Sequence, residues 1–398
     1  MRERINLKSV KAWFPVFALT LSAFIFNTSL FVPIGLLTDI ASDFHISAAK
    51  AGWMTSWYAW VIAVLSLPLM LAAGRMDCRK LLLWALGGFV ACSALSALSP
   101  DYSVLLAARM GVACSHCIFW GLAAALAVKV APEGGRETAL GLITTGTSIA
   151  MIIGLPLGRA VGLYMTWRMT FASIAAIGLL VALFLGMVFP KLPNVRPMTL
   201  HRLPVLFRNK TLMGIYVFTL LTTMAHYTGY SYVEPFLAQV ARLDEHVITL
   251  VLMLVGLSGI AGSVLFSKFF TRMPDVFLFS ASLGITASLM LLRPLSGCAW
   301  AIIILCFLWG IAYTLFNLSL QMGVMEVLPQ ASTITMTIYA VTFNLGIGCG
   351  TTIGGAVCTH ASIAYIGCVG GIIALIAFVY CIRNVLHPLR PVPGRGLF

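Results

Sequence analysis

The stretch RMTFASIAAIGLLVALFLGMVFP, residues 168–190, decides the fold class of this chain. After Arg168 it contains no charged side chain. An α-helix rises about 1.5 Å per residue and the hydrocarbon layer of a membrane is about 30 Å thick, so a helix of this length crosses the layer. Comparable apolar stretches recur along the whole chain. We therefore expect an all-α membrane protein.

The composition excludes an ordinary soluble domain. Of the 398 residues, 60% are hydrophobic and 9% are charged, and the mean hydropathy is +1.00. A soluble domain carries about 25% charged residues. The basic residues 1–11 resemble the start of a signal peptide, but the apolar run after them is too long for a cleaved one. We expect this run to remain as the first span.

Apolar runs separated by glycine, proline or charged residues predict twelve transmembrane helices. The longest polar connection, residues 191–210, follows the sixth of them. We expect six-helix bundles at residues 1–190 and 211–398, joined by this cytoplasmic linker. The predicted spans are residues 12–37, 48–73, 81–98, 103–129, 138–164, 168–190, 211–238, 246–269, 274–293, 297–327, 331–359 and 362–385.

The distribution of positive charge predicts the orientation in the membrane. The chain has 25 lysines and arginines against 12 aspartates and glutamates, a formal net charge of +13. Most of the basic residues fall at the termini, in the linker 191–210 and in the loops that share its side. Because basic loops stay in the cytoplasm, both termini are expected to be cytoplasmic. Topology thus accounts for the charge, and nucleic acid is not an expected partner.

Two internal matches indicate a duplication. GLPLG at 154–158 matches GTTIG at 350–354, and GLLTDIA at 35–41 matches PFLAQVA at 235–241. Such a duplication implies two parallel six-helix repeats, with a substrate site between them near the membrane midplane. The glycines of these segments are expected to let helices pack closely.

No sequence pattern of an enzyme is present. The chain lacks G-x-S-x-G, H-E-x-x-H and P-loop patterns, and no predicted span contains two acids. The ten cysteines lie almost all inside apolar runs, where we expect small packing residues rather than metal ligands. We expect no catalytic residue, no metal site and no cofactor, with a proton gradient as the energy source.

Polar and aromatic side chains near the middle of the predicted spans are the candidate substrate contacts. Such groups are costly in hydrocarbon, so they usually face the bundle interior or a wet cavity. Amides hydrogen-bond hydroxyl groups and aromatic faces pack on C–H surfaces, which suits a neutral, polyhydroxylated ligand. The alternative is that these groups only hydrogen-bond neighbouring helices. The candidates are Asn27, Tyr58, His116, Trp120, Tyr227, Tyr230, Asn317, Gln321 and Asn344.

Three residues are candidates for proton coupling: Arg109, His116 and Glu234. A histidine titrates near neutral pH without help. Arg109 lies within a predicted span and needs a carboxylate or carbonyl partner there. Glu234 lies roughly 15 Å outward of the middle of its predicted span. An outer-gate or proton-entry residue and a simple interfacial acid are both open for Glu234.

Several motifs are similar to those of the major facilitator superfamily and, within it, the twelve-span drug:proton antiporter-1 group. GLPLGRAVG at 154–162 resembles the antiporter motif of span five, and FNLGIGCGTTIGG at 343–355 resembles the motif of span eleven. The stretches AFIFNTSLFVPIGLL at 23–37, HCIFW at 116–120 and AHYTGYSYVEPF at 225–236 resemble the bacterial sugar efflux transporters. The resemblance covers nearly the whole chain.

The chain departs from the family pattern at two places. In the loop between spans two and three, LAAGRMDCRK at 71–80 has Arg75 where the family has an aspartate, so that residue's gating role is not carried over. In span one, Leu30 stands where relatives often have a glutamate. If that glutamate carries the coupled proton in relatives, another residue must replace it here. The candidates are His116, His226 and Glu234.

The resemblance implies an alternating-access exporter of small neutral sugars or glycosides, arabinose-like or thiogalactoside-like, in exchange for protons. A multidrug antiporter of the same fold and a non-transporting membrane sugar sensor are the alternatives. The expected location is the bacterial inner membrane. The expected partners are a sugar, protons and the lipid bilayer, and we expect a monomer.

Overall fold

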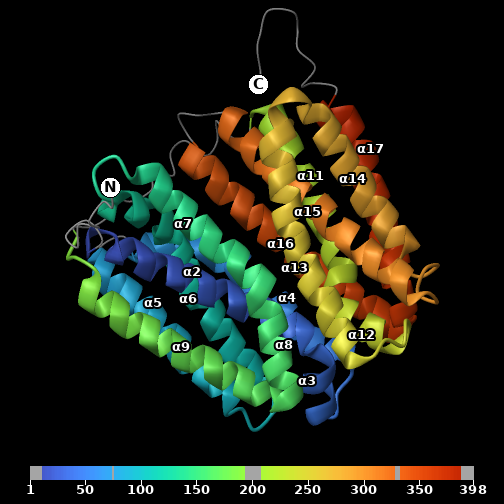
Figure 1. Cartoon of the computed structure of the whole chain (residues 1–398), viewed down its shortest axis with the longest axis horizontal. Coiled ribbons are helices and arrows are strands. Elements are labelled where there is room, and N and C mark those ends of the chain that lie inside the picture. The colour runs from blue at the N-terminus through green and yellow to red at the C-terminus, as the bar shows by residue number, and fades with distance from the viewer. Residues whose placement is uncertain (1–10, 74–75, 193–207, 328–331, 387–398) are drawn as a thin grey trace, which may run out of the picture. The chain divides into compact units, whose positions relative to one another are not determined.

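The computed structural model describes residues 11–73, 76–192, 208–327 and 332–386 (Figure 1). Within these ranges every regular element is a helix. Most of the expected linker, residues 191–210, lies outside the described residues, and so does Arg75.

The first six predicted spans are helical. Span five runs through three consecutive helical elements, of which the middle one is a π turn. The elements are α2 (Phe14–Gly35), the short α3 (Leu37–Asp43), α4 (Ala48–Ala73), α5 (Cys78–Ala97), α6 (Tyr102–Val130), α7 (Arg136–Ile149), η1 (Ala150–Gly154), α8 (Leu155–Tyr164) and α9 (Trp167–Val188).

The last six predicted spans are helical as well, which confirms the all-α fold class. Their order repeats that of the first six, including a short helix after the first span. The elements are α11 (Lys210–Tyr230), the short α12 (Val233–Gln239), α13 (Glu245–Phe269), η3 (Phe270–Arg272), α14 (Pro274–Leu291), α15 (Ala299–Val327), α16 (Ser332–His360), η5 (Ile363–Tyr365), α17 (Ile366–Cys381) and η6 (Ile382–Leu386).

Nine helical segments of the described residues are long and apolar enough to cross a membrane. The helix α14 is apolar but shorter, and α4 and α11 are not among the nine. Buried polar residues such as Thr222 and His226 lower the hydropathy of α11. Polar groups within a membrane helix usually face the protein interior. Its polarity therefore marks α11 as a helix that lines an internal polar region.

Side-chain caps explain where several helices begin. Asp101 accepts hydrogen bonds from the backbone N–H groups of Ser103 and Val104 at the start of α6, at 2.8 and 3.0 Å. Thr166 and Asp244 cap α9 and α13 in the same way. Such caps satisfy N–H groups that the first helical turn leaves without partners.

Spans one and seven break in the same way near their C-terminal ends. Leu36, between α2 and α3, has φ −117° and ψ 13°, and Tyr232, before α12, has φ −119° and ψ 16°. Each break is followed by a helix of seven residues. The breaks pair Leu36 with Tyr232, so the sequence match of 35–41 with 235–241 is wrong by about one helical turn.

Glycines allow span five to lie very close to α2. A Cβ atom at Gly146 would lie 2.6 Å from the Thr20 carbonyl oxygen, and one at Gly158 would lie 2.5 Å from a Val32 methyl group. Neither position has room for a larger side chain without movement of α2. The expected packing role is confirmed for Gly146, Gly154 and Gly158, but not for Gly141, which has no atom of a neighbouring helix within 4 Å.

Span eleven approaches span seven through an equivalent contact. A Cβ atom at Gly354 would lie 2.5 Å from the Thr228 carbonyl oxygen, and Gly350 faces the Met224 carbonyl. The sequence separation between facing residues is the same as in span five and α2. The two pairs of helices therefore pack in the same register, as expected for a duplicated structure. The register agrees with the match of GLPLG to GTTIG.

The described residues group into two compact units. The first is Met1–Pro33 with Val64–Pro197, and the second is Ile34–Ala63 with Met198–Phe398. In the first unit α5 packs against α6 and α9, and in the second α14 packs against α15 and α17 (Figure 1). In the second unit α11 also packs against α16 and α17. Spans three and nine thus have equivalent neighbours in their own units.

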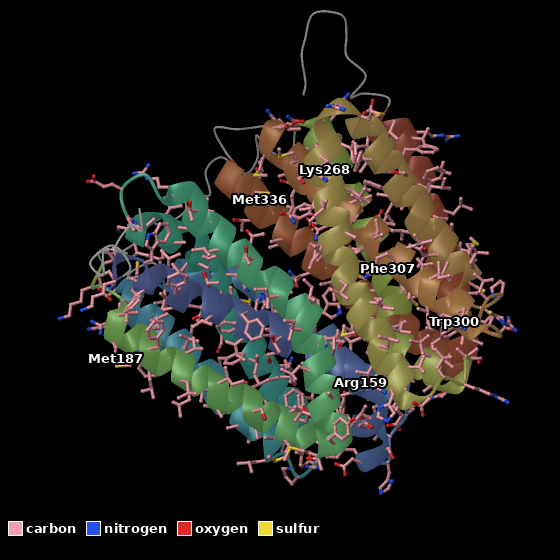
Figure 2. All side chains as sticks on the ribbon, in the orientation of Figure 1. Arg159, Met187, Lys268, Trp300, Phe307 and Met336 are labelled. Atoms are coloured by element: carbon pink, nitrogen blue, oxygen red, sulfur yellow. The ribbon has the colours of Figure 1, made fainter. Side chains whose placement is uncertain are left out.

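Large apolar side chains cover the outside of the helices. Met187 in α9 is 76% exposed and Trp300 in α15 is 75% exposed (Figure 2). A soluble protein rarely exposes so many large apolar groups together, whereas a membrane protein places them in lipid. The exterior therefore agrees with the composition.

Candidate functional site

Asn27, His116 and Trp120 all lie in the first unit, where His116 and Trp120 contact each other and Asn27 contacts Thr147. The Asn27 Nδ2 atom donates to the Ala23 carbonyl of its own helix at 2.9 Å and to Thr147 Oγ1 at 3.4 Å. His116 lies edge-on to Phe26, with ring centroids 5.8 Å apart, and 6.1 Å from Trp120 one turn further along α6. The indole Nε1 of Trp120 is buried and has no hydrogen-bond partner among the described residues. Trp120 thus holds an indole donor that a ligand could satisfy.

Arg109 binds the backbone of α2. Its guanidinium donates to the Ser29 hydroxyl at 2.8 Å and to the Ser29 carbonyl at 2.6 Å. That carbonyl would normally accept from the N–H of the residue four positions later, but this residue is Pro33, which has no N–H. The guanidinium also lies over the Phe171 ring, 5.4 Å from its centroid. The carbonyl partner expected for Arg109 is therefore the one that Pro33 leaves open.

His226 lies inside a cage of four aromatic rings in the second unit. Tyr313 stacks on the imidazole, with centroids 3.6 Å apart and ring planes 8° apart, and Tyr230 stacks at 4.9 Å. Tyr227 and Trp309 contact it edge-on, with centroids 5.0 and 5.1 Å away. Among the described residues, neither His226 Nδ1 nor Trp309 Nε1 has a hydrogen-bond partner. We call these five residues the aromatic cage.

Asn317 and Gln321 continue from the cage along α15. Gln321 Nε2 donates to Asn317 Oδ1 at 2.7 Å, and the hydroxyl of Tyr339 in α16 donates to the same oxygen at 2.9 Å. Tyr339 also lies 6.0 Å from Phe343, which in turn lies 6.4 Å from Tyr313 of the cage. The amide pair and the cage thus share one face of α15.

Two candidates lie outside these groups. Asn344 donates its Nδ2 to the Ala340 carbonyl of its own helix at 2.9 Å rather than to a neighbouring helix. Tyr58 is buried in α4 and belongs to the second unit. The structure therefore gathers Asn27, His116 and Trp120 in one unit, and Tyr227, Tyr230, Asn317 and Gln321 in the other.

Glu234 is buried at the start of α12. Its Oε2 atom accepts from the Thr38 backbone N–H at 3.2 Å and from the Thr38 hydroxyl at 2.8 Å. Thr38 occupies the second position of α3, and Glu234 the second position of α12. The two equivalent helix breaks therefore meet at this hydrogen-bonded pair.

Sequence reasoning missed several of these partners. Trp309 and Tyr313 stand one helical turn apart in an apolar span, where they read as ordinary core residues. Their spacing from Asn317 on one face of α15 was the available signal. Thr38, the partner of Glu234, has no sequence signal, because it lies far away in the chain and faces Glu234 only after folding.

The described residues contain no group of three or more histidine, cysteine or acidic side chains that could hold a metal ion. Cys114 and Cys117, the C-x-x-C pair, are both free thiols. Cys117 instead accepts a hydrogen bond from the Ser66 hydroxyl at 3.5 Å.

Comparisons with known proteins agree with this geometry. The model of the Major Facilitator Superfamily matches residues 17–337. A "Probable sugar efflux transporter" of Helicobacter acinonychis (strain Sheeba) is 42% identical over 365 residues, which is 92% of this chain and 93% of that protein.

Two solved structures share the fold. Both are of a bacterial homologue of the human lysosomal transporter Spinster, in inward-facing unoccupied and occupied conformations. Their TM-scores are 0.75 and 0.73 at 16% identity, covering 93% and 94% of this chain and 96% and 97% of theirs. Twelve helical spans, their internal repeat and these matches lead to one conclusion. The chain belongs to the Major Facilitator Superfamily and is a multi-pass membrane transporter.

Proposed function

We propose that this protein exports small neutral sugars or glycosides, arabinose-like or thiogalactoside-like, by proton antiport and alternating access. The name of the 42% identical relative supports a sugar as the substrate. The proposed location is the bacterial inner membrane, with both termini cytoplasmic and the chain working as a monomer without a cofactor. Residues 1–190 and 211–398 are the proposed halves, joined by the linker 191–210.

The observation that carries the proposal is the aromatic cage with its neighbouring amides. The packed rings form an apolar aromatic wall, and Asn317 and Gln321 place neutral hydrogen-bonding groups beside it. The four rings that contact His226 are the neutral side chains of tyrosine and tryptophan. Such a surface can pack on the C–H face of a sugar ring while the neighbouring amides hydrogen-bond its hydroxyl groups.

The proposed substrate contacts keep the full set expected from the sequence. Asn27, His116 and Trp120 act from the first unit. Tyr227 and Tyr230 act from the cage, with Tyr58, Asn317, Gln321 and Asn344 completing the set. We extend it with Trp309 and Tyr313, because their rings form two sides of the cage.

The test is the accumulation of radiolabelled arabinose or thiogalactoside in cells, with and without a protonophore. The protein should lower the intracellular level, and the protonophore should abolish the difference. Asn317→Leu removes a proposed hydrogen bond to the sugar and should weaken export about tenfold or more. A tenfold loss of affinity corresponds to about 1.4 kcal/mol of binding free energy. Asn384→Leu is the matched control, since the Asn384 amide is exposed and donates only to its own helix at 3.3 Å. Unchanged sugar levels across a panel of sugars would sink the proposal.

Proton coupling is proposed to involve Glu234, His116 and Arg109. Glu234→Gln keeps an oxygen that accepts from Thr38 but cannot release a proton. If Glu234 carries the proton, this variant should equilibrate sugar across the membrane without concentrative export. Intact energised export by Glu234→Gln would remove Glu234 from the coupling set and leave sugar export standing.

The alternatives predict different results in the same cells. A multidrug antiporter would protect cells from lipophilic cations and export fluorescent dyes. A sugar sensor would bind sugar without changing its intracellular level. Dye export without sugar export, or binding without transport, would favour these readings.

A further inference from the structure

Two hydrogen bonds to its oxygen atom orient the Asn317 side-chain amide. Its Oδ1 atom accepts one hydrogen bond from Gln321 Nε2 at 2.7 Å and another from the Tyr339 hydroxyl at 2.9 Å. An amide oxygen has two lone pairs, so these two donors saturate it. The Nδ2 group keeps two N–H donors, and within the part of the chain that the structure describes neither has a protein acceptor. Asn317 can therefore offer only donors to a ligand.

Tyr339 is the rigid member of this arrangement. Its ring is 4% exposed and packs beside Phe343 at 6.0 Å, so its hydroxyl is held in place by α16. Gln321, by contrast, is a long side chain one turn along α15 and is only partly buried. A phenol with two side-chain torsions loses less conformational freedom than a glutamine does when it holds a partner in place.

Asn317 is also accessible and correctly placed. It is partly exposed, whereas Tyr313, one turn earlier on the same face of α15, is buried in the aromatic cage. Residues four positions apart on a helix are neighbours on its surface. A sugar whose C–H face packs on the cage would thus bring an edge oxygen toward Asn317.

We propose that Tyr339 is a positioning residue that locks the Asn317 amide as a pure donor, so that the substrate atom it meets is an acceptor oxygen. This inference rests on the proposed sugar export and names the hydrogen-bond sense at one position of the substrate. A ring oxygen, a glycosidic oxygen or a hydroxyl acting as acceptor satisfies Nδ2. A group that can only donate leaves the amide donors without an acceptor once the substrate has displaced water, which is unfavourable.

The test compares monodeoxy and monodeoxyfluoro arabinoses, position by position, as substrates of the full-length protein in proteoliposomes. Carbon-bound fluorine accepts a weak hydrogen bond but cannot donate one. At the position that meets Asn317, the fluoro sugar should be transported with a KM about three- to tenfold lower than that of the deoxy sugar. If the contacted atom is the ring oxygen, replacing it by a methylene group should raise KM instead.

Tyr339→Phe should remove this discrimination. The freed amide can then rotate and present its oxygen, so the KM values of the fluoro and deoxy sugars should converge while kcat changes little. Tyr216→Phe is the matched control, because it also removes a buried phenol, one that donates to the Thr335 carbonyl at 2.9 Å and not to Asn317. It should lower thermal stability by a similar amount and leave the discrimination intact.

The outcomes separate this inference from the proposed function. Sugar transport with the same fluoro-to-deoxy ratio in wild type, Tyr339→Phe and Tyr216→Phe overturns the positioning role alone. Absence of any sugar transport by the wild-type protein overturns the proposed function together with it. If Tyr339→Phe does not fold, Gln321→Met removes the other donor to Asn317 Oδ1, and it should relax the ratio in the same direction. An unchanged ratio in that variant also counts against the inference.

Discussion

Arg109 shows how a single backbone atom can decide the role of a charged residue. The Ser29 carbonyl has no helical donor because Pro33 lacks an N–H, and Arg109 supplies the missing hydrogen bond. A bidentate guanidinium can bond the carbonyl and the hydroxyl of Ser29 at once, which a lysine ammonium does poorly. Arg109 therefore also ties α6 to α2 at the point where Pro33 interrupts the backbone hydrogen bonds of α2.

Arg109→Ala should lower the free energy of unfolding by about 1.5–3 kcal/mol, the usual contribution of a hydrogen bond to a charged group. In a Pro33→Ala background the loss should be smaller, because the new N–H of residue 33 can bond Ser29 itself. Thermal denaturation of the four proteins in detergent gives the coupling between the two sites. Equal losses in both backgrounds would show that Arg109 does not compensate for Pro33.

For single residues, the sequence predicted which side chains belong to the candidate site better than it predicted which side chains contact each other. His116 and Trp120 on one face of α6, and Asn317 and Gln321 on one face of α15, follow from helical spacing and meet as expected. The Tyr339 and Thr38 contacts do not follow from spacing, because they join different helices. Only folding decides which helices become neighbours.

Among the secondary-structure elements, the close glycine contacts control how spans pack. Gly354 of α16 faces a carbonyl oxygen of α11, with the Tyr232 ring 2.8 Å from where a Cβ atom would lie. Gly141 of α7 has nothing within 4 Å of the same point. The two positions therefore give opposite expectations for one chemical change.

Gly354→Ala should destabilise the protein by roughly 1–3 kcal/mol and reduce transport, because the methyl group must push α16 away from α11. Gly141→Ala should be neutral or stabilise the protein by up to about 1 kcal/mol, since alanine has the higher helix propensity. Melting curves and sugar uptake of both variants check this pair. A well-folded, fully active Gly354→Ala protein would contradict the packing described above.

The sequence predicted the elements but not their interruptions. The predicted span 211–238 is in fact α11 and α12 with a break at Tyr232, and the predicted span 138–164 contains the π turn. Pro235 and Pro156 are the local signals for these features, yet a proline alone does not say whether a helix ends, bends or widens. Apolar length, by contrast, is a direct consequence of membrane thickness, which is why the twelve spans were found.

For the whole molecule, orientation in the membrane is the property that the sequence predicts most directly and that can be checked in intact cells. Lys268 lies in the last turn of α13 (Figure 2), and Arg272 ends the η3 turn that follows, on the side that the charge pattern assigns to the cytoplasm. Cys298 is exposed and lies in the connection between α14 and α15, one span further along the chain. The other cysteines are buried or only partly exposed.

A membrane-impermeant maleimide added to intact bacteria should therefore label the protein at Cys298. Cys298→Ala should abolish the labelling without affecting transport. Labelling that requires permeabilised cells would reverse the orientation and place the termini outside.

The π turn Ala150–Gly154 determines where span five can lose a residue and still pack against α2. A π turn holds one residue more than an α-helical turn, so removing Ile152 would leave a continuous α-helix with Gly146 and Gly158 still facing α2. In α16, which is α-helical throughout, removing Thr352 would rotate Gly354 by about 100° away from Thr228. The two halves, equivalent in their packing, therefore differ in where a deletion can occur, and shortened members of this family should have lost residues in span five at this turn.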